Sequence, residues 1–153
     1  MCRIVCLKFS KSYILIAKIN KRILRIVFNI RFYKGSSIMT KMTTEEAFVK
    51  VLQMHGIEHS FGIIGSAFMP ISDIFPDAGI TFWDVAHETN GGLIADGYTR
   101  ATGKMSMVIA QNGPGITGLV TPIKTAYWNH TPLLLVTPQA ANKTMGQGGF
   151  QEV

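Results

Sequence analysis

The acid that stands out in this sequence is Glu88, which follows His87 and precedes two glycines, Gly91 and Gly92. Its ordinary role would be to stabilise the positive end of a helix dipole, which contributes about 0.3–1 kcal/mol. The glycines favour a functional role, because each lowers helix propensity by about 1 kcal/mol relative to Ala. Their presence indicates that a ligand or another backbone packs closely there. We therefore expect Glu88 to be a catalytic carboxylate that is buried at an interface and holds a proton.

A glycine-rich turn at residues 113–118, Gly-Pro-Gly-Ile-Thr-Gly, matches the dinucleotide-binding pattern G-x-G-x-x-G. Two features argue against a nucleotide. The sequence has no acid between Asp96 and Glu152 to hold a ribose, and Pro114 removes an amide that would face a phosphate. The simpler interpretation is a tight turn that brings the backbone close to some ligand or to a neighbouring chain.

Other common catalytic patterns are missing from the sequence. His, Cys and acidic residues do not recur at the spacing of a metal site, so we expect no metal bound by this segment alone. The lack of a Gly-x-Ser-x-Gly motif argues against a serine hydrolase. Two Cys residues within the first six positions cannot form a disulfide scaffold. We expect His87 and His130 to cap or pack rather than to bind metal.

The 153 residues carry a formal net charge of +6, which is unevenly distributed. The first 38 residues contain nine Lys or Arg residues and no acid, whereas the rest contains six basic and nine acidic residues. This distribution excludes nucleic-acid binding by the globular part. The composition, 47% hydrophobic and 16% charged, fits one compact domain or part of a larger one. The sequence lacks a run of about 18 apolar residues that could span a membrane, so we expect a soluble, cytoplasmic protein.

Residues 1–38 form a basic extension for which three interpretations remain open. Between Tyr13 and Phe28, Ile and Leu are interleaved with Lys and Arg, as in a helix that lies on a membrane surface. Organelle-targeting peptides are also basic and poor in acids. The third interpretation, which we favour, is that the extension is not native and that the protein starts at Met39 or Met42. The domain would then occupy residues 39–153.

Helical and strand patterns alternate along residues 39–153. Thr43 and Glu46 form a capping box, and Gly103 ends a later helix. Helices are expected at 43–56, 70–75, 88–102 and from 113 to about 129. Strands are expected at 60–64, 80–85, 105–110 and 132–136. This alternation predicts an α/β fold with a doubly wound parallel sheet, covered by helices on both faces.

In such a sheet, ligands bind outside the carboxyl ends of the strands. The residues at those ends are mostly small, polar or amide-bearing, and they are Gly65-Ser66, His87-Glu88, 112–115 and 137–139. Glu88 is the one ionisable acid among them. We therefore expect the site at this edge of the sheet.

With these motifs in place, residues 42–153 resemble the pyrimidine-binding domain of thiamine-diphosphate enzymes of the acetolactate synthase type. The resemblance rests on His87-Glu88, on Ala-Asp-Gly-Tyr-Thr-Arg at 95–100 and on Gly-Pro-Gly at 113–115, in that order. Each motif is weak alone, but the set is specific. Further segments are similar to an acyltransferase branch of the family, namely 42–56, 80–84, 126–132 and 137–143.

The resemblance implies a thiamine-diphosphate-binding fold, incomplete here and preceded by the basic extension. It implies that Glu88 hydrogen-bonds a ring nitrogen of the cofactor's aminopyrimidine and so assists removal of a proton from the thiazolium carbon. Gln151 would be a second catalytic residue, near the reacting carbon. The cofactor-binding residues would be Gly65, Ser66, Glu88, Gly113, Pro114, Gly115 and Gln139.

The resemblance also implies parts outside this chain. In the family, Mg²⁺ and the diphosphate are held by a separate carboxyl-terminal domain with a Gly-Asp-Gly signature, which this sequence lacks. Active sites form between subunits, so we expect a small-molecule substrate and a homo-oligomer that assembles through this domain. The chain would be a truncated amino-terminal piece, inactive alone. The alternatives are another enzyme of the family that condenses or decarboxylates 2-oxo acids, and a non-catalytic fragment or membrane-surface protein.

Overall fold

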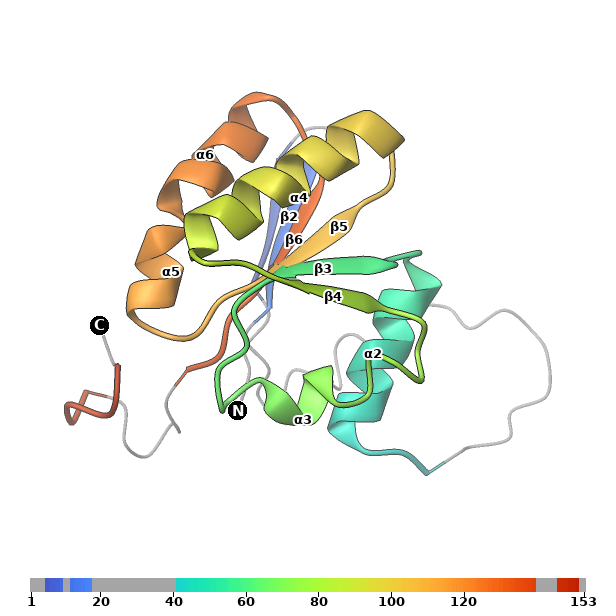
Figure 1. The fold of residues 1–153 in the computed structure, drawn as a ribbon, viewed down its shortest axis with the longest axis vertical. Helices are drawn as coiled ribbons and strands as arrows, with labels where there is room; N and C mark the ends of the chain where they lie inside the picture. Colours follow the sequence, from blue (N-terminus) through green and yellow to red (C-terminus); the bar gives the residue numbers. More distant parts are fainter. Residues whose placement is uncertain (1–4, 10–11, 18–40, 140–145, 152–153) are drawn as a thin grey trace.

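The computed structural model describes residues 5–9, 12–17, 41–139 and 146–151, and it has an α/β fold (Figure 1). Four parallel strands form most of the sheet, namely β3 (His59–Gly62), β4 (Thr81–Asp84), β5 (Ser106–Ile109) and β6 (Leu133–Val136). Their order across the sheet is β6-β5-β3-β4. The predicted doubly wound parallel sheet is confirmed, with strand ends that differ by up to two residues from the prediction.

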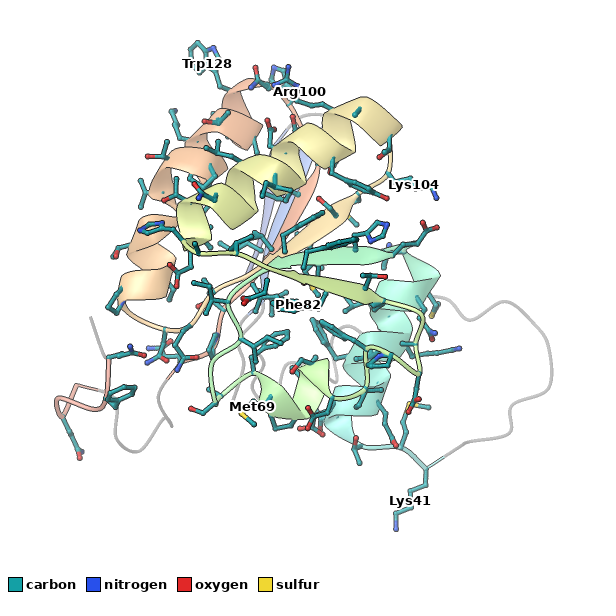
Figure 2. All side chains as sticks on the ribbon, viewed as in Figure 1. Lys41, Met69, Phe82, Arg100, Lys104 and Trp128 are labelled. Atoms are coloured by element: carbon teal, nitrogen blue, oxygen red, sulfur yellow. The ribbon has the colours of Figure 1, made fainter. Side chains whose placement is uncertain are left out.

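Helices cover both faces of this sheet (Figure 1). On one face lie α2 (Thr44–Met54) and α3 (Met69–Ser72), and on the other lie α4 (Glu88–Thr102), α5 (Pro114–Gly118) and α6 (Val120–Trp128). Side chains alternate along a strand, so β5 sends Met107 and Ile109 into the core beside α2 and sends Val108 into the core beside α4. Phe82 of β4 packs against the first core (Figure 2).

Capping residues set the ends of the two longest helices. The Glu46 amide donates to the Thr43 hydroxyl at 3.2 Å, and the Thr43 amide donates to the Glu46 carboxylate at 2.6 Å. The predicted capping box is therefore confirmed. Helix α4 has its predicted bounds, because His87 Nδ1 accepts from the Thr89 amide at its start and Gly103 takes a left-handed φ of 72° at its end.

The prediction of one helix from 113 to about 129 is wrong, because the chain forms α5 and α6 with Leu119 between them. Pro122 explains the break, since it has no amide to donate to the Gly118 carbonyl four residues earlier. That carbonyl accepts instead from the Thr89 hydroxyl of α4 at 2.5 Å. The break therefore ties the first turn of α4 to the end of α5.

The described part of the N-terminal extension forms two strands, β1 (Val5–Phe9) and β2 (Ser12–Ala17). Strand β1 pairs antiparallel with β2, and β2 pairs parallel with β6, which extends the sheet to six strands. The structure thus has a strand at residues 13–17, where a basic helix is one of the interpretations drawn from the sequence. Residues 18–38 lie outside the described part. Within the part of the chain that the structure describes, no helix has the length and apolar character needed to cross a membrane.

Candidate functional site

The strand order places a topological switch point between β3 and β5. From β3 the chain passes through α3 to β4 on one side, and it then returns through α4 to β5 on the other side of β3. In open parallel sheets, ligands bind at the carboxyl ends of the strands at such a point. Two of the predicted site residues lie just beyond these strands, Gly65 three residues after the end of β3 and Gly113 four residues after the end of β5.

Glu88 is the first residue of α4 and is half-buried. Its carboxylate faces α5, with Oε1 3.0 Å from the position that a Cβ at Gly115 would take and Oε2 3.7 Å from that position at Gly118. The carboxylate takes part in none of the hydrogen bonds or ion pairs among the described residues. It is packed against backbone on one side and still has free acceptor positions for a ligand.

The glycines beside Glu88 mark close packing, as predicted. A Cβ at Gly91 would lie 3.2 Å from Cα of Gly62, so the first turn of α4 touches the backbone of β3. A Cβ at Gly92 would lie 2.5 Å from Cβ of Pro122 in α6. The close neighbours are therefore strand backbone and a second helix, and both contacts fix where α4 holds Glu88.

The sequence analysis missed Gln111, which comes two residues after the last residue of β5. Its side-chain oxygen is buried, has no hydrogen-bond partner among the described residues, and fills the space that a Cβ at Gly65 would need. A buried acceptor without a donor costs about 1–3 kcal/mol, so a ligand with an N–H or O–H group would gain from contact here. An amide residue directly after the strand predicted at 105–110 was the one available signal.

Residues 150–151 pack onto the turn between β5 and α5. Asn112 Nδ2 donates to the carbonyl of Phe150 at 3.0 Å and to the carbonyl of Gln151 at 3.2 Å. Gly113 has a left-handed φ of 67°, and the Gln151 carbonyl oxygen fills the space that a Cβ at Gly113 would need. Gln151 is thereby held next to Gly113, and its own side-chain oxygen is buried without a described partner.

The remaining predicted cofactor-binding residues are less closely joined. Ser66 is exposed in the turn after β3, Pro114 is exposed at the start of α5, and Gln139 is half-buried three residues after β6. The described contacts do not connect these side chains to Glu88. Among the described residues, no three potential ligands of His, Cys, Asp or Glu cluster as a metal site would require.

Residues 42–153 match the family described as thiamine pyrophosphate enzyme, N-terminal TPP binding domain. Over 113 residues the chain is 86% identical to a sulfoacetaldehyde acetyltransferase of Roseovarius nubinhibens, a match that covers 74% of this chain and 19% of that protein. Over 117 residues it is 38% identical to an acetolactate synthase of Arthrospira platensis, a match that covers 74% of this chain and 20% of that protein. The chain therefore spans about a fifth of the length of the curated relatives it matches.

A solved structure shares the same fold. The thiamine diphosphate-dependent 4-hydroxybenzoylformate decarboxylase of Rhodococcus jostii superposes with a TM-score of 0.67 at 25% identity, over 72% of this chain and 21% of that one. The family and the fold that the sequence motifs implied are confirmed by these matches. The chain belongs to the thiamine pyrophosphate enzymes, as a member of their N-terminal TPP-binding domain family.

Proposed function

We propose that this chain is the N-terminal part of a sulfoacetaldehyde acetyltransferase, which converts sulfoacetaldehyde and phosphate to acetyl phosphate and sulfite with thiamine diphosphate. The observation that carries the substrate assignment is the 86% identity to the Roseovarius nubinhibens protein. The 38% identity to an acetolactate synthase makes condensation of 2-oxo acids the second candidate. A non-catalytic fragment is the third.

The described residues fit the aminopyrimidine end of thiamine diphosphate. Three side chains near the switch point each present an acceptor oxygen without a described hydrogen-bond partner, namely the Glu88 carboxylate and the side-chain oxygens of Gln111 and Gln151. An aminopyrimidine carries an amino group and, when protonated, a ring N–H, so its donors complement these acceptors. This complementarity supports the proposal from the chemistry of the side chains alone.

In the proposed mechanism, Glu88 accepts a hydrogen bond from the pyrimidine ring and holds the proton at that ring nitrogen. The close contacts of Gly91 and Gly92 keep the Glu88 carboxylate in place beside the pyrimidine ring. The chemistry supplied by thiamine diphosphate, when it is bound, is a nucleophilic carbon for attack on an aldehyde. The residues proposed to contact the cofactor or substrate are Gly65, Ser66, Glu88, Gly113, Pro114, Gly115, Gln139 and Gln151.

The proposal extends to groups beyond the described residues. We propose that Mg²⁺ and the diphosphate are held by a further domain, and that the enzyme is a cytoplasmic homo-oligomer in which this domain faces another subunit. Large apolar side chains are exposed on the outer sides of α4 and α6, namely Leu93, Ile94, Val120 and Trp128. Such apolar exposure supports a subunit contact on this face.

The test replaces the matching segment of the Roseovarius nubinhibens protein with residues 42–153, and we call this hybrid the complete chimera. The parent protein is the matched control. We expect the complete chimera to release sulfite and form acetyl phosphate from sulfoacetaldehyde and phosphate at a rate close to the parent's. Formation of acetolactate from pyruvate without sulfite release would replace the proposal with its second candidate. A folded chimera that does neither would leave the non-catalytic fragment.

A further inference from the structure

A carboxamide three residues after the end of β5 joins two distant parts of the chain. Asn112 is 8% exposed, and its Nδ2 atom donates to the carbonyls of Phe150 and Gln151, which are 38 and 39 residues away in sequence. A carboxamide nitrogen has two hydrogens, so both donors of Asn112 are used on the main chain of this one segment. Asn112 therefore offers no further donor to a ligand.

The segment that Asn112 holds has a conformation that the chain would not choose alone. Gln151 has a φ of 52°, in the left-handed region that residues other than glycine seldom adopt. Such a backbone conformation persists only where the surroundings determine it. The surroundings here are the Asn112 amide and Gly113, whose lack of a side chain leaves room for the Gln151 carbonyl oxygen.

The backbone contacts decide where the Gln151 side chain goes. Its Oε1 atom is buried beside the turn and has no hydrogen-bond partner among the described residues. If the carbonyls of residues 150 and 151 were released, φ of Gln151 would relax and the buried oxygen would turn toward water. The position of the Gln151 Oε1 atom thus depends on Asn112, which contacts the main chain of residues 150 and 151 and not the Oε1 atom itself.

We propose that Asn112 is a positioning residue, which acts by fixing Gln151 in the orientation that the site requires. This inference rests on the proposed function in one respect, namely that Gln151 contacts cofactor or substrate. It assigns a role to a side chain that is outside the predicted catalytic and cofactor-binding sets. It also explains why an amide stands at position 112, since a carboxylate of the same shape has no hydrogens to donate.

The first test uses the full 153-residue chain and needs no cofactor. Asn112→Asp keeps the shape of the side chain but removes both donors, and Asn129→Asp at the exposed end of α6 is the matched control. We expect amide hydrogen exchange in residues 146–151 to become at least tenfold faster in Asn112→Asp only, with exchange in α4 unchanged. Equal exchange in the two variants would overturn the proposed contact.

The second test asks whether Asn112 acts through Gln151, by a double-mutant cycle in the complete chimera. Asn112→Asp and Gln151→Ala should each lower kcat for sulfite release more than they raise KM, and the double variant should be no slower than Gln151→Ala alone. Additive losses would show that Asn112 acts independently and would overturn the inference. A normal rate for Gln151→Ala would instead refute the catalytic role of Gln151, and an inactive unsubstituted chimera would refute the proposed function. In both cases the exchange experiment still decides whether Asn112 holds the segment.

Discussion

Two glycines of α4 should respond in opposite ways to alanine, because one faces α6 and the other faces solvent. A Cβ at Gly92 would lie 2.5 Å from Cβ and 2.6 Å from Cγ of Pro122, and 3.1 Å from Cδ2 of Leu119. Carbon atoms in contact prefer a separation of about 3.5–4.0 Å, so Gly92→Ala must push the helices apart by about 1 Å. A Cβ at Gly97 would have no neighbour within 4 Å.

The magnitude follows from comparing these two variants with each other. Each gains about 1 kcal/mol of helix propensity over Gly, and this gain cancels in the comparison. Overpacking costs about 1–3 kcal/mol, and a proline ring cannot rotate out of the way. We therefore expect Gly97→Ala to raise the free energy of unfolding by up to about 1 kcal/mol. The free energy of unfolding of Gly92→Ala should be about 1–3 kcal/mol lower than that of Gly97→Ala.

The assay is urea unfolding of the full 153-residue chain, followed by circular dichroism, with the slope of the transition compared between variants. An equal slope would show that the two variants differ in stability and not in the compactness of either state. If Gly92→Ala were as stable as Gly97→Ala, the close approach of α4 to α6 would be wrong. The packing argument that places Glu88 beside Gly115 would then fail with it.

Three further predictions concern the site and the ends of the elements. In the complete chimera, Glu88→Gln should keep the urea midpoint but slow sulfite release by about 10²-fold or more, and near-normal release would refute the role of Glu88. Thr43→Ala should lower the free energy of unfolding by about 0.5–2 kcal/mol through loss of the cap, whereas an unchanged urea midpoint would show that the cap is dispensable. The hydrogen bond and charge of Lys104 lower the pKa of Glu58 below 4.5, and Glu58 in turn raises the pKa of Lys104 above 10.5. The ion pair between Glu58 and Lys104 should therefore stabilise the fold fully between about pH 4.5 and pH 10.5. This stabilisation should be lost as the pH falls through the lowered pKa of Glu58, or as it rises through the raised pKa of Lys104. The difference in Tm between the unsubstituted chain and Glu58→Gln should vanish in strong acid, and a constant difference would contradict this assignment.

Local signals were sufficient to predict some elements and insufficient for others. Helix α4 has its predicted bounds because its start and its end depend on neighbouring residues, His87 and Gly103. Pro122 was a local signal for the break at Leu119 that the helical pattern overrode, and the partner that satisfies the freed Gly118 carbonyl, the Thr89 hydroxyl, lies 29 residues away in sequence. A periodicity pattern contains no information about such a partner.

The site residues were likewise predictable where the signal is local and not where it depends on strand order. Glu88 stood out because an acid and two glycines at the start of a helix form a local pattern. Gln111 was missed because its importance comes from strand order, which puts β5 beside β3 and makes Gln111 a neighbour of Gly65. Strands that follow one another along the chain are often neighbours in the sheet, and the switch point is the place where that expectation fails.

The unpaired groups at this edge also limit which end of a cofactor the described residues can bind. The Glu88 carboxylate and the buried side-chain oxygens of Gln111 and Gln151 are acceptors, so a diphosphate or sulfonate placed against these oxygens would have acceptors facing acceptors. The nearby Asn112 amide already donates both hydrogens to residues 150 and 151. A heterocycle that carries N–H groups meets no such conflict. The acceptor oxygens at this edge therefore suit the aminopyrimidine end of thiamine diphosphate better than its anionic end.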